Sequence, residues 1–476
     1  MLRNTALPAG RSLRFGAIAL AFYLLTFLSR PLFFRSNYLQ SLYTASDNLH
    51  IAVFATSGNY HLCQLHISAA LMGYPAYTLV NWDDPEDENP MKQHLAKIEG
   101  ALKYLEALPA ANQDDLVFMV DGYDLWFQLP HSYIIKRYRD VVEEAHARHV
   151  AELGEALVAK HNIRNTVLFG PDKQCAPAGR NHASCWAVPE SWMPPLSFGP
   201  DTDHGKDTHN RPRWLNSGTI MGPARELRDV FAAALERTKT QYLTDSDQFY
   251  FASLFGEQSY ARRLLKLDHD KQRGFDTAGD EEFLHPKPSD ESRKVPALPG
   301  RVEYFIGLDW SSAIFQTTGF YADYITWVRH NESSPYIAQT SKTGNYHHHF
   351  ALQADLVGKG PPGKPPLASI DPALGAWKSL PLATNTASRN VVPVMHINGK
   401  KGYRILWWPR MWFFPYIEQI MKELKSGNGN GKRQGDERNA SDGANTFNKG
   451  GAGWIDWKDV CGKYEERLMG RSREPN

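Results

Sequence analysis

Residues 116–130 read LVFMVDGYDLWFQLP, and an aspartate directly follows the apolar run that opens this stretch. Five consecutive apolar residues are typical of a short strand buried on both faces, as in a parallel sheet. Asp121 and Asp124 follow at once, with Tyr123 between them. A single Asp after a strand often only forms a turn or caps a helix. Two carboxylates at one strand end are also the oxygen ligands that a hard divalent cation prefers.

The preceding segments alternate between strand and helix patterns. Strands are predicted within 49–59 (LHIAVFATSGN) and over 76–82, and helices over 61–74 and 91–108, where apolar residues recur at helical spacing. Strand, helix, strand, helix, strand is the rhythm of a parallel sheet covered by helices. The sequence therefore predicts an α/β fold with a mixed, mainly parallel sheet. Asp121 and Asp124 would lie at the carboxyl ends of its strands, where such sheets bind ligands.

The later chain continues this pattern with irregular insertions. Strands are predicted at 166–170, at 214–222 with an interruption at Ser-Gly, and at 391–399. Helices are predicted from 224 and over 245–255, and the Pro- and Gly-rich stretches 277–300 and 355–375 are interpreted as surface loops. The low-complexity segment 425–452 is predicted to be a disordered linker, and 453–476 a C-terminal helix that docks on the domain.

The composition limits the classes of function. The 476 residues include 42% hydrophobic and 12% aromatic residues, which is enough for a sizeable core. The formal net charge is only +1, from 53 basic and 52 acidic side chains, so no global field favours nucleic acid as a partner.

The N-terminus resembles a membrane-targeting segment. Arg3, Arg11 and Arg14 precede fourteen uncharged, mainly apolar residues, 15–28. We expect a cytosolic tail (1–14), an uncleaved signal anchor (15–34) and a stem (35–48), followed by a lumenal domain (49–424). This arrangement predicts a single-pass type II protein of the Golgi or endoplasmic reticulum membrane. A cleaved signal peptide and a hydrophobic helix of a soluble protein are the alternatives.

The four cysteines, Cys63, Cys175, Cys185 and Cys461, show no metal-type spacing. Cys175 and Cys185 flank a loop rich in Pro, Gly and Asn. In an oxidising lumen these two residues could form a disulfide, and two free buried thiols are the alternative.

Five short elements together resemble the glycosyltransferase domain of the collagen lysyl hydroxylases and, more distantly, the procollagen galactosyltransferases. They follow the family's order and lie between about residue 49 and about residue 403. The elements are VDGYD (120–124), LNSG (215–218), TDSDQ (244–248), LDWSSAIFQ (308–316) and VMHING (394–399). The resemblance implies a GT-A fold, a Mn²⁺ cofactor and a UDP-sugar donor.

The resemblance also assigns roles to individual residues. It implies that Asp121, Asp124 and His396 coordinate Mn²⁺, and imidazole does suit Mn²⁺ better than Mg²⁺. The residues that it places at the nucleotide are Thr56, Trp82, Lys97, Tyr123, Gly399, Lys400 and Lys401. The residues that it places on the side of the sugar and the acceptor are Trp186, Asn216, Asp245, Asp247 and Gln248. The acidic pair Asp245 and Asp247 can equally be an N-terminal helix face that the helix dipole favours.

These observations predict a metal-dependent enzyme that moves a hexose from a UDP-sugar to a hydroxyl of a carbohydrate or glycoprotein acceptor. One alternative is a metal-dependent nucleotide-sugar hydrolase or nucleotidyltransferase that uses the same carboxylates. The other is a non-catalytic lumenal binding protein with the same fold.

Overall fold

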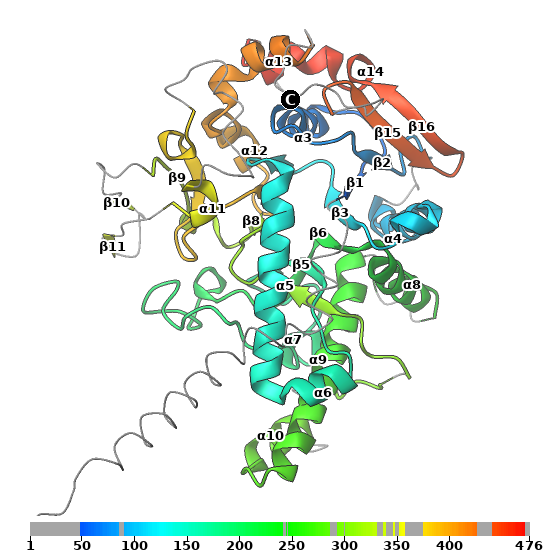
Figure 1. Cartoon of the computed structure of the whole chain (residues 1–476), viewed down its shortest axis with the longest axis vertical. Helices are drawn as coiled ribbons and strands as arrows, with labels where there is room; N and C mark the ends of the chain where they lie inside the picture. The colour runs from blue at the N-terminus through cyan, green and yellow to red at the C-terminus, as the bar shows by residue number, and fades with distance from the viewer. Residues whose placement is uncertain are drawn as a thin grey trace, which may run out of the picture. The chain divides into compact units, whose positions relative to one another are not determined.

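A computed structural model of the chain describes residues 48–84, 90–240, 244, 246–285, 293–298, 300–330, 337–338, 346–347, 352–357, 375–425 and 440–471 (Figure 1). The predicted tail, signal anchor and nearly all of the stem lie outside these residues. None of the helices within them is long and apolar enough to cross a membrane.

An eight-stranded sheet forms the centre of the described chain, with the strand order β16-β15-β2-β1-β3-β6-β5-β7. The hydrogen-bonding pattern makes β6 and β16 antiparallel to the other six strands. The strands of this sheet are β1 (Leu49–Phe54), β2 (Thr78–Val80), β3 (Leu116–Asp121), β5 (Val167–Asp172), β6 (Trp214–Pro223), β7 (Ile306–Leu308), β15 (Gly443–Asn448) and β16 (Gly451–Asp456). The predicted mixed, mainly parallel sheet is therefore confirmed.

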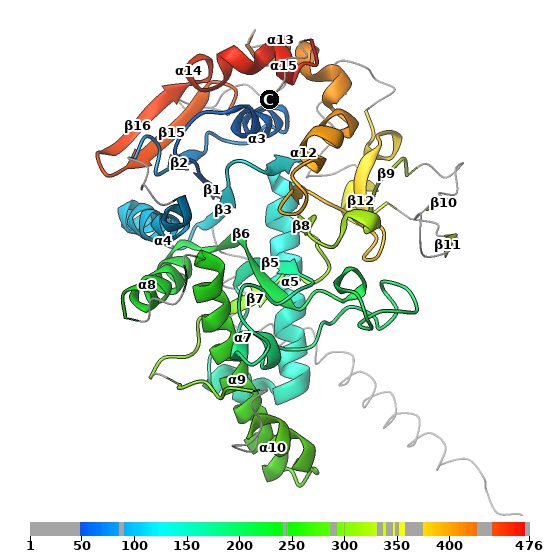
Figure 2. The ribbon, with the colours of Figure 1, turned by 180° about the vertical axis from the view of Figure 1, so that it is seen from behind.

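Helices flank this sheet, as Figures 1 and 2 show from opposite sides. The described helices are α3 (Tyr60–Leu71), α4 (Pro90–Ala107), α5 (His131–Leu153), α6 (Glu155–Lys160), α7 (Ala183–Trp186), α8 (Ala224–Thr240), α9 (Asp247–Gln272), α10 (Ala278–Leu284), α11 (Ala354–Val357), α12 (Tyr403–Leu406), α13 (Ile417–Lys425), α14 (Trp457–Cys461) and α15 (Glu465–Leu468). The start of α3 is capped by Asn59, whose side-chain oxygen accepts from two backbone N–H groups of the first turn.

The apolar strands are buried on both faces, as continuous hydrophobic runs require. On one face, Ala52 and Met119 belong to a core cluster that also includes side chains of α4, α8 and α9. On the other face, Phe118 stacks on Phe315 with ring centroids 5.3 Å apart. Phe315 belongs to a small second sheet that packs there.

The second sheet, in the order β4-β14-β8, brings a late segment of the chain to the end of β3. It consists of β4 (Leu125–Phe127), β8 (Phe315–Thr317) and β14 (Val394–His396). β14 is antiparallel to β4, with His396 opposite Leu125, and parallel to β8. Since Leu125 follows Asp124 directly, this register places His396 beside the acidic pair.

Two smaller sheets complete the described strands. One has the order β13-β12-β9 and consists of β9 (Ile325–Val328), β12 (Leu382–Asn385) and β13 (Asn390–Val391). The other pairs β10 (Ile337–Ala338) with β11 (Tyr346–His347).

The C-terminal segment differs from the prediction. Residues 443–452, expected within a disordered linker, belong to the hairpin β15–β16, and β15 is hydrogen-bonded to β2 in the central sheet. The helix expected over 453–476 is, in its described part, a strand end followed by α14 and α15. Gly and Asn dominate this segment, so its own composition does not indicate a strand. The open edge of β2 supplies the hydrogen-bond partners that make it one.

Other predicted boundaries also needed correction. The segment 277–300, interpreted as a loop, contains α10, and α11 lies at the start of 355–375. β6 is one continuous ten-residue strand, although its register against β5 shifts beside Ser-Gly. α9 continues to Gln272, well beyond the predicted end at 255, because buried residues recur along it to Leu267.

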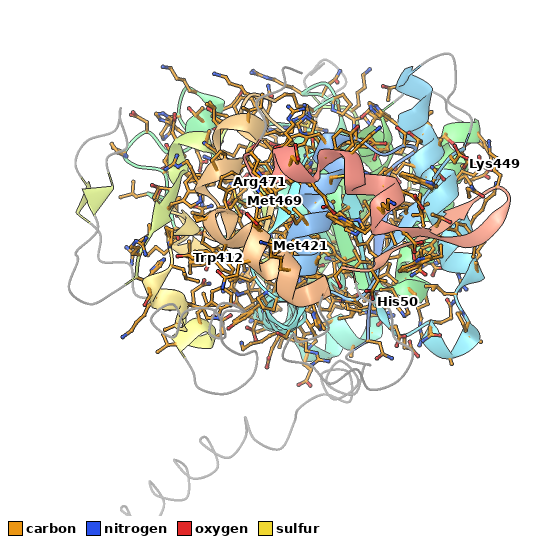
Figure 3. All side chains as sticks on the ribbon, turned by 90° about the horizontal axis from the view of Figure 1, so that it is seen from above. His50, Trp412, Met421, Lys449, Met469 and Arg471 are labelled. Atoms are coloured by element: carbon orange, nitrogen blue, oxygen red, sulfur yellow. A yellow bond between two sulfur atoms is a disulfide. The ribbon has the colours of Figure 1, made fainter. Side chains whose placement is uncertain are left out.

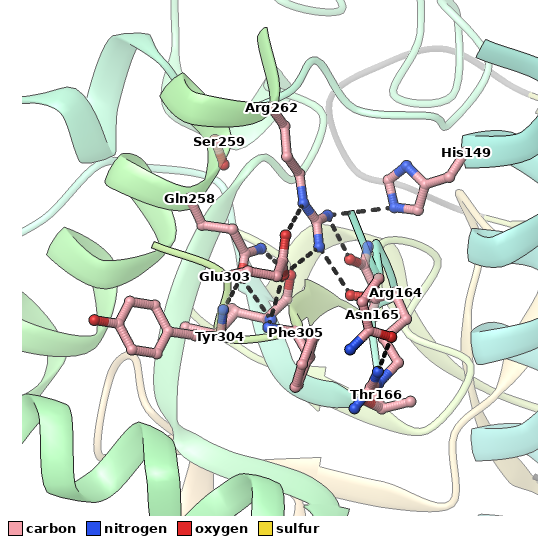
Figure 4. A network of polar contacts seen from close by, with 12 residues as sticks. His149, Arg164, Asn165, Thr166, Gln258, Ser259, Arg262, Glu303, Tyr304 and Phe305 are labelled. Atoms are coloured by element: carbon pink, nitrogen blue, oxygen red, sulfur yellow. Dashed lines mark hydrogen bonds and ion pairs between the residues drawn. The ribbon is translucent and has the colours of Figure 1, made fainter. Parts of the chain in front are cut away.

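A polar network holds the start of β7 against α9 and α5 (Figure 4). Arg262 of α9 forms an ion pair with Glu303 at 2.7 Å and donates hydrogen bonds to Asn165 and to the backbone oxygen of Arg164. Gln258, one turn earlier, accepts from the backbone N–H groups of Tyr304 and Ile306. These bonds satisfy backbone groups that would otherwise be buried without partners.

Two disulfides fasten distant and local segments. Cys175–Cys185 closes a ten-residue separation and confirms one of the two sequence-based alternatives. Cys63–Cys461 joins α3 to α14 across 398 residues and was not foreseen. At the same end of the molecule, Arg471 pairs with Glu418 of α13, so the last described residues lie against that helix (Figure 3).

We predict that removing the long-range disulfide destabilises the protein more than removing the local one. On the chain-entropy account, closing the loop contributes about 6 kcal/mol for the separation of 398 residues and about 3 kcal/mol for that of 10 residues. The free energy of unfolding of Cys63→Ala/Cys461→Ala should therefore fall further than that of Cys175→Ala/Cys185→Ala. Equal losses in denaturant titrations of the two double variants would contradict the prediction.

We also predict that a buried histidine makes the docking of the C-terminal segment sensitive to acid. His66 of α3 accepts from the Tyr77 hydroxyl, and its Nε2 lies 2.6 Å from the Ala440 oxygen. Burial lowers the pKa of His66 from 6.5 to about 4. The folded state thus resists protonation, and stability that is complete above pH 6.5 declines as the pH falls towards 4. The difference in pKa corresponds to about 3 kcal/mol.

The test compares the free energy of unfolding between pH 7 and pH 4 in the wild type, in His66→Gln and in His94→Gln, which alters an exposed histidine of α4. His66→Gln should show the shallower dependence on pH. If its slope matches those of the wild type and the control, His66 does not have this role.

Candidate metal centre

Three side chains that the sequence predicts as metal ligands converge at the carboxyl end of β3. Ligand atoms of Asp121, Asp124 and His396 all lie within 4.8 Å of one another. Nε2 of His396 is 3.7 Å from Asp121 Oδ2 and 3.4 Å from Asp124 Oδ1. Ligands at about 2.1 Å from one ion lie roughly 3–4 Å apart, so the spacing fits a single divalent cation.

The orientation of His396 comes from backbone placement and packing. The residue ends β14 and is only 2% exposed, and its Nδ1 is buried without a hydrogen-bond partner. The backbone oxygen of Asp124 accepts from the N–H of Ile397 at 2.6 Å, so the pairing of β4 and β14 continues past the histidine. The nitrogen that faces the carboxylates, Nε2, is therefore the one available to a metal.

Gly218 makes the close approach of these groups possible. It lies in β6, whose Thr219 pairs with Val120 at the end of β3. A Cβ atom at position 218 would lie 2.0 Å from His396 Cε1 and 2.8 Å from Asp121 Oδ2. Any side chain there would displace the candidate ligands, so the Ser-Gly step in this strand has a steric reason rather than a turn-forming one.

Two lysines offset the negative charge. Lys97 of α4 donates to Asp121 at 2.8 Å and to the Ser217 oxygen at 2.9 Å, and its Nζ is 3.2 Å from Asp247. Burial alone would lower the pKa of Lys97, but the two carboxylates raise it above its usual value. Lys97 is thus a charged link between the candidate metal centre and the start of α9.

Lys401 plays the corresponding part for Asp124. Its Nζ donates to Asp124 Oδ2 at 2.8 Å, from a largely exposed position after β14. Burial would raise the pKa of Asp124, yet His396 and Lys401 together hold it well below its usual range. One carboxylate oxygen of Asp124 therefore faces His396, and the other accepts from the Lys401 side chain.

The predicted nucleotide residues Tyr123, Thr56 and Trp82 gather around the loop after β1. The Tyr123 hydroxyl accepts from the N–H groups of Thr56 at 3.0 Å and Ser57 at 3.1 Å, and it donates to the backbone oxygen of Ser57 at 3.1 Å. Trp82 reaches the same loop, since a Cβ on Gly58 would lie 3.5 Å from its ring. A planar base would meet aromatic side chains and backbone polar groups here.

The turn that contains Gly399 is held against the end of β8. Asn398 accepts from the N–H groups of Thr318 at 2.9 Å and Gly319 at 2.8 Å. A Cβ on Gly399 would lie 3.2 Å from the Gly319 backbone, so a small residue suits this position. Lys400, next in sequence, is exposed. Of the two candidate lysines, Lys401 is the one that contacts the acidic pair.

The predicted acceptor-side residues Asn216, Asp247 and Gln248 also lie close together. Gln248 accepts from the Asn216 side chain and from the Ser217 N–H, both at 3.3 Å. Asp247, the first residue of α9, is buried and pairs with Lys97. Asp245 lies outside the described residues.

Trp186 does not have the setting that was predicted for it. Its indole is buried in a small cluster and makes edge contacts with Tyr260 and Phe283, each at 5.7 Å. Its Nε1 donates to the Asn181 oxygen. A ring enclosed in this way offers no face to a sugar, so we interpret Trp186 as a core residue. The pattern around it contains many apolar residues, which a burial argument would have weighed more heavily.

Sequence reasoning missed Asp172, the last residue of β5. Its Oδ2 is 3.5 Å from the Asn216 amide nitrogen, and burial raises its pKa to about 6. The signal was present in the sequence, because TVLFGPD repeats the pattern of an apolar run ending in an acid. The decisive fact is spatial: β5 pairs with β6 beside the Asn216 position.

No family model matches the chain, and no curated protein matches it.

We predict that Lys97→Met lowers stability and that a divalent cation partly restores it. Removing one partner of a buried ion pair typically costs about 3–5 kcal/mol, because the remaining charges lose their compensation. Here Asp121 and Asp247 would face each other uncompensated, and Mn²⁺ bound to Asp121 would replace part of the missing charge.

Melting temperatures with and without Mn²⁺ test this, with Lys103→Met, which alters an exposed lysine of the same helix, as the control. A Mn²⁺-induced rise in Lys97→Met no larger than in the wild type would contradict the charge-compensating role.

Proposed function

We propose that this chain is a metal-dependent glycosyltransferase of the GT-A type, which moves a hexose from a UDP-sugar to a hydroxyl of a carbohydrate or glycoprotein acceptor. The observation that carries the proposal is the convergence of Asp121, Asp124 and His396 at the carboxyl end of a buried strand. The mixed sheet supports it, because ligands of such sheets bind at the carboxyl ends of parallel strands.

The chemistry of the donor set favours Mn²⁺. Two carboxylates and one imidazole suit a transition metal better than Mg²⁺. When bound, the ion would neutralise the diphosphate and favour its departure from the sugar. Asp121, Asp124 and His396 would hold it.

The remaining charges around the centre suit a diphosphate leaving group. The Lys401 side chain is largely exposed. It contacts Asp124 and can turn towards an incoming phosphate. Lys97 is held by two carboxylates and is too buried to move, so its role is to keep Asp121 oriented. The aromatic pair Tyr123 and Trp82 would hold the base beside the loop after β1.

The reacting sugar would then lie towards Asp172, Asn216, Asp247 and Gln248. Asn216 and Gln248 are amides that can both donate and accept, which suits binding of sugar hydroxyls. Asp172 is a buried carboxylate whose pKa of about 6 allows it to exchange a proton near neutral pH. We propose that these groups orient the donor sugar and polarise the acceptor hydroxyl.

Location in the secretory pathway is part of the proposal. Both disulfides of the described chain are of the kind that persists in an oxidising compartment. The basic, apolar N-terminal sequence would provide the membrane anchor that places the domain in the Golgi or endoplasmic reticulum lumen.

The direct test is donor binding and turnover in Asp124→Asn. Calorimetry should show that UDP binding to the wild type requires Mn²⁺, and that the variant loses this binding by about 100-fold or more, since a charged ligand to the ion is removed. Asp140→Asn, at an exposed position of α5, is the matched control. Folding of each variant is checked by its melting temperature.

A screen of UDP-sugars, read as release of UDP, separates the alternatives. Release that an added acceptor accelerates supports transfer, whereas acceptor-independent release alone supports a hydrolase. Mn²⁺-dependent binding without any release supports a binding protein. Donor affinity near that of the wild type in Asp124→Asn would overturn the metal assignment.

A further inference from the structure

A second recess, separate from the metal centre, has features of a binding site. It has a volume of about 600 Å³. It is bounded by α5, by the loop after α7, by the residues that follow β7 and by the turn between β12 and β13. The side chains used below are Arg148, Trp192, Trp310, Tyr324, Ser388 and Arg389. Leu196, also at this recess, is 71% exposed.

Two indoles form its aromatic part. The rings of Trp192 and Trp310 lie 5.6 Å apart at 33°, and the Arg148 guanidinium lies 4.0 Å from the Trp192 ring. Neither indole N–H has a hydrogen-bond partner among the described residues. Aromatic rings with polar edges are the lining that small polar ligands with an apolar face require.

Unused polar groups accompany the rings. The Ser388 hydroxyl is buried and has no hydrogen-bond partner. Arg389 is exposed and makes no ion pair or hydrogen bond within the described chain, whereas Arg148 is already paired with Glu144 at 3.0 Å. Asp309 is not free to compensate Arg389, because its carboxylate accepts three backbone N–H groups of the 313–315 turn. The recess therefore has one uncompensated cation and one unsatisfied hydroxyl.

The recess adjoins the end of β5. Phe198 and Tyr324 line it and also enclose the buried Lys173, whose Nζ lies 3.3 Å and 4.4 Å from their rings. Lys173 directly follows Asp172 at the end of β5. Consecutive residues of one strand thus contact the recess lining and, through Asp172 and Asn216, the acceptor side of the candidate site.

The walls are rigid enough to preserve a shape. The Asp309 hydrogen bonds hold the turn after β7, and the Arg262 and Gln258 network of Figure 4 fixes the start of the same strand. A preformed site loses less free energy on ordering when a ligand binds.

We propose that this recess binds a pyranose ring that carries an anionic group, such as a uronic acid unit. The indoles would cover the apolar face of the ring, Ser388 would bond a hydroxyl and Arg389 would bind the anion. We take this charged sugar to be part of the acceptor, and that assignment rests on the proposed glycosyltransferase function. The proposal that the recess binds the sugar does not depend on that function.

The experiment uses the full-length chain and two probes, methyl glucuronide and methyl glucoside, with binding followed by saturation-transfer NMR. We expect saturable binding of the glucuronide without Mn²⁺ or UDP, and at least tenfold weaker binding of the glucoside. Trp192→Ala should weaken binding of both probes, and Arg389→Asn should remove the preference for the anion. Asn is chosen because position 389 has a φ of 64°, which Asn tolerates better than most residues.

Arg273→Asn, which removes an exposed arginine outside the recess, is the control and should bind as the wild type does. Absence of glucuronide binding in the wild type, equal affinity for the two probes, or unchanged binding in both recess variants would each overturn the proposal. UDP binding in the presence of Mn²⁺ is measured on the same samples. If the wild type binds the glucuronide but does not bind UDP, the glycosyltransferase function is rejected and the recess remains a saccharide site.

Discussion

Two carboxylates at the end of a strand that is buried on both faces must be compensated, and much of this molecule is arranged to do so. Asp124 is paired with Lys401 of the turn after β14 and lies 3.4 Å from His396 Nε2, while Asp121 is paired with Lys97 of α4. The register of the second sheet places His396 opposite Leu125, next to Asp124. Gly218 then follows from steric necessity, since β6 passes where any Cβ would collide with the ligands. A buried charge without such partners would cost several kcal/mol.

The C-terminal segment packs against β2, α3 and the loop after β1. β15 extends the central sheet at β2, the Asn448 side chain donates to the Trp82 oxygen, and Cys461 is bonded to Cys63 of α3. Val460 lies against the loop after β1, close enough that a Cβ on Gly58 would lie 3.2 Å from its oxygen. The residues that we propose to hold the nucleotide are therefore supported by a segment from the far end of the chain. The Cys63–Cys461 disulfide and the contact of His66 with Ala440 both hold this segment against α3.

The proposed donor site and the second recess both adjoin residues at the end of β5. Asp172 faces Asn216 and the metal centre, while its neighbour Lys173 is enclosed by aromatic side chains that line the second recess. The buried Nζ of Lys173 donates to the backbone oxygen of Thr208, and this bond also ties the loop after α7 to this strand.

The sequence by itself determined the alternation of strands and helices, the mainly parallel sheet and the acidic pair at its carboxyl edge. These features follow from hydrophobic periodicity, which reports burial within a segment. His396 was joined to the pair only through a family resemblance. The Lys97–Asp247 link, the proximity of Asp172, the β15–β16 hairpin and the Cys63–Cys461 bond came from the tertiary structure alone. Their residues are far apart in the chain, and ladder hydrogen bonds, steric fit and charge compensation between distant segments decide which of them meet. The same reason explains Trp186, whose local motif indicated a sugar platform but whose burial against Tyr260 and Phe283 makes it part of the core.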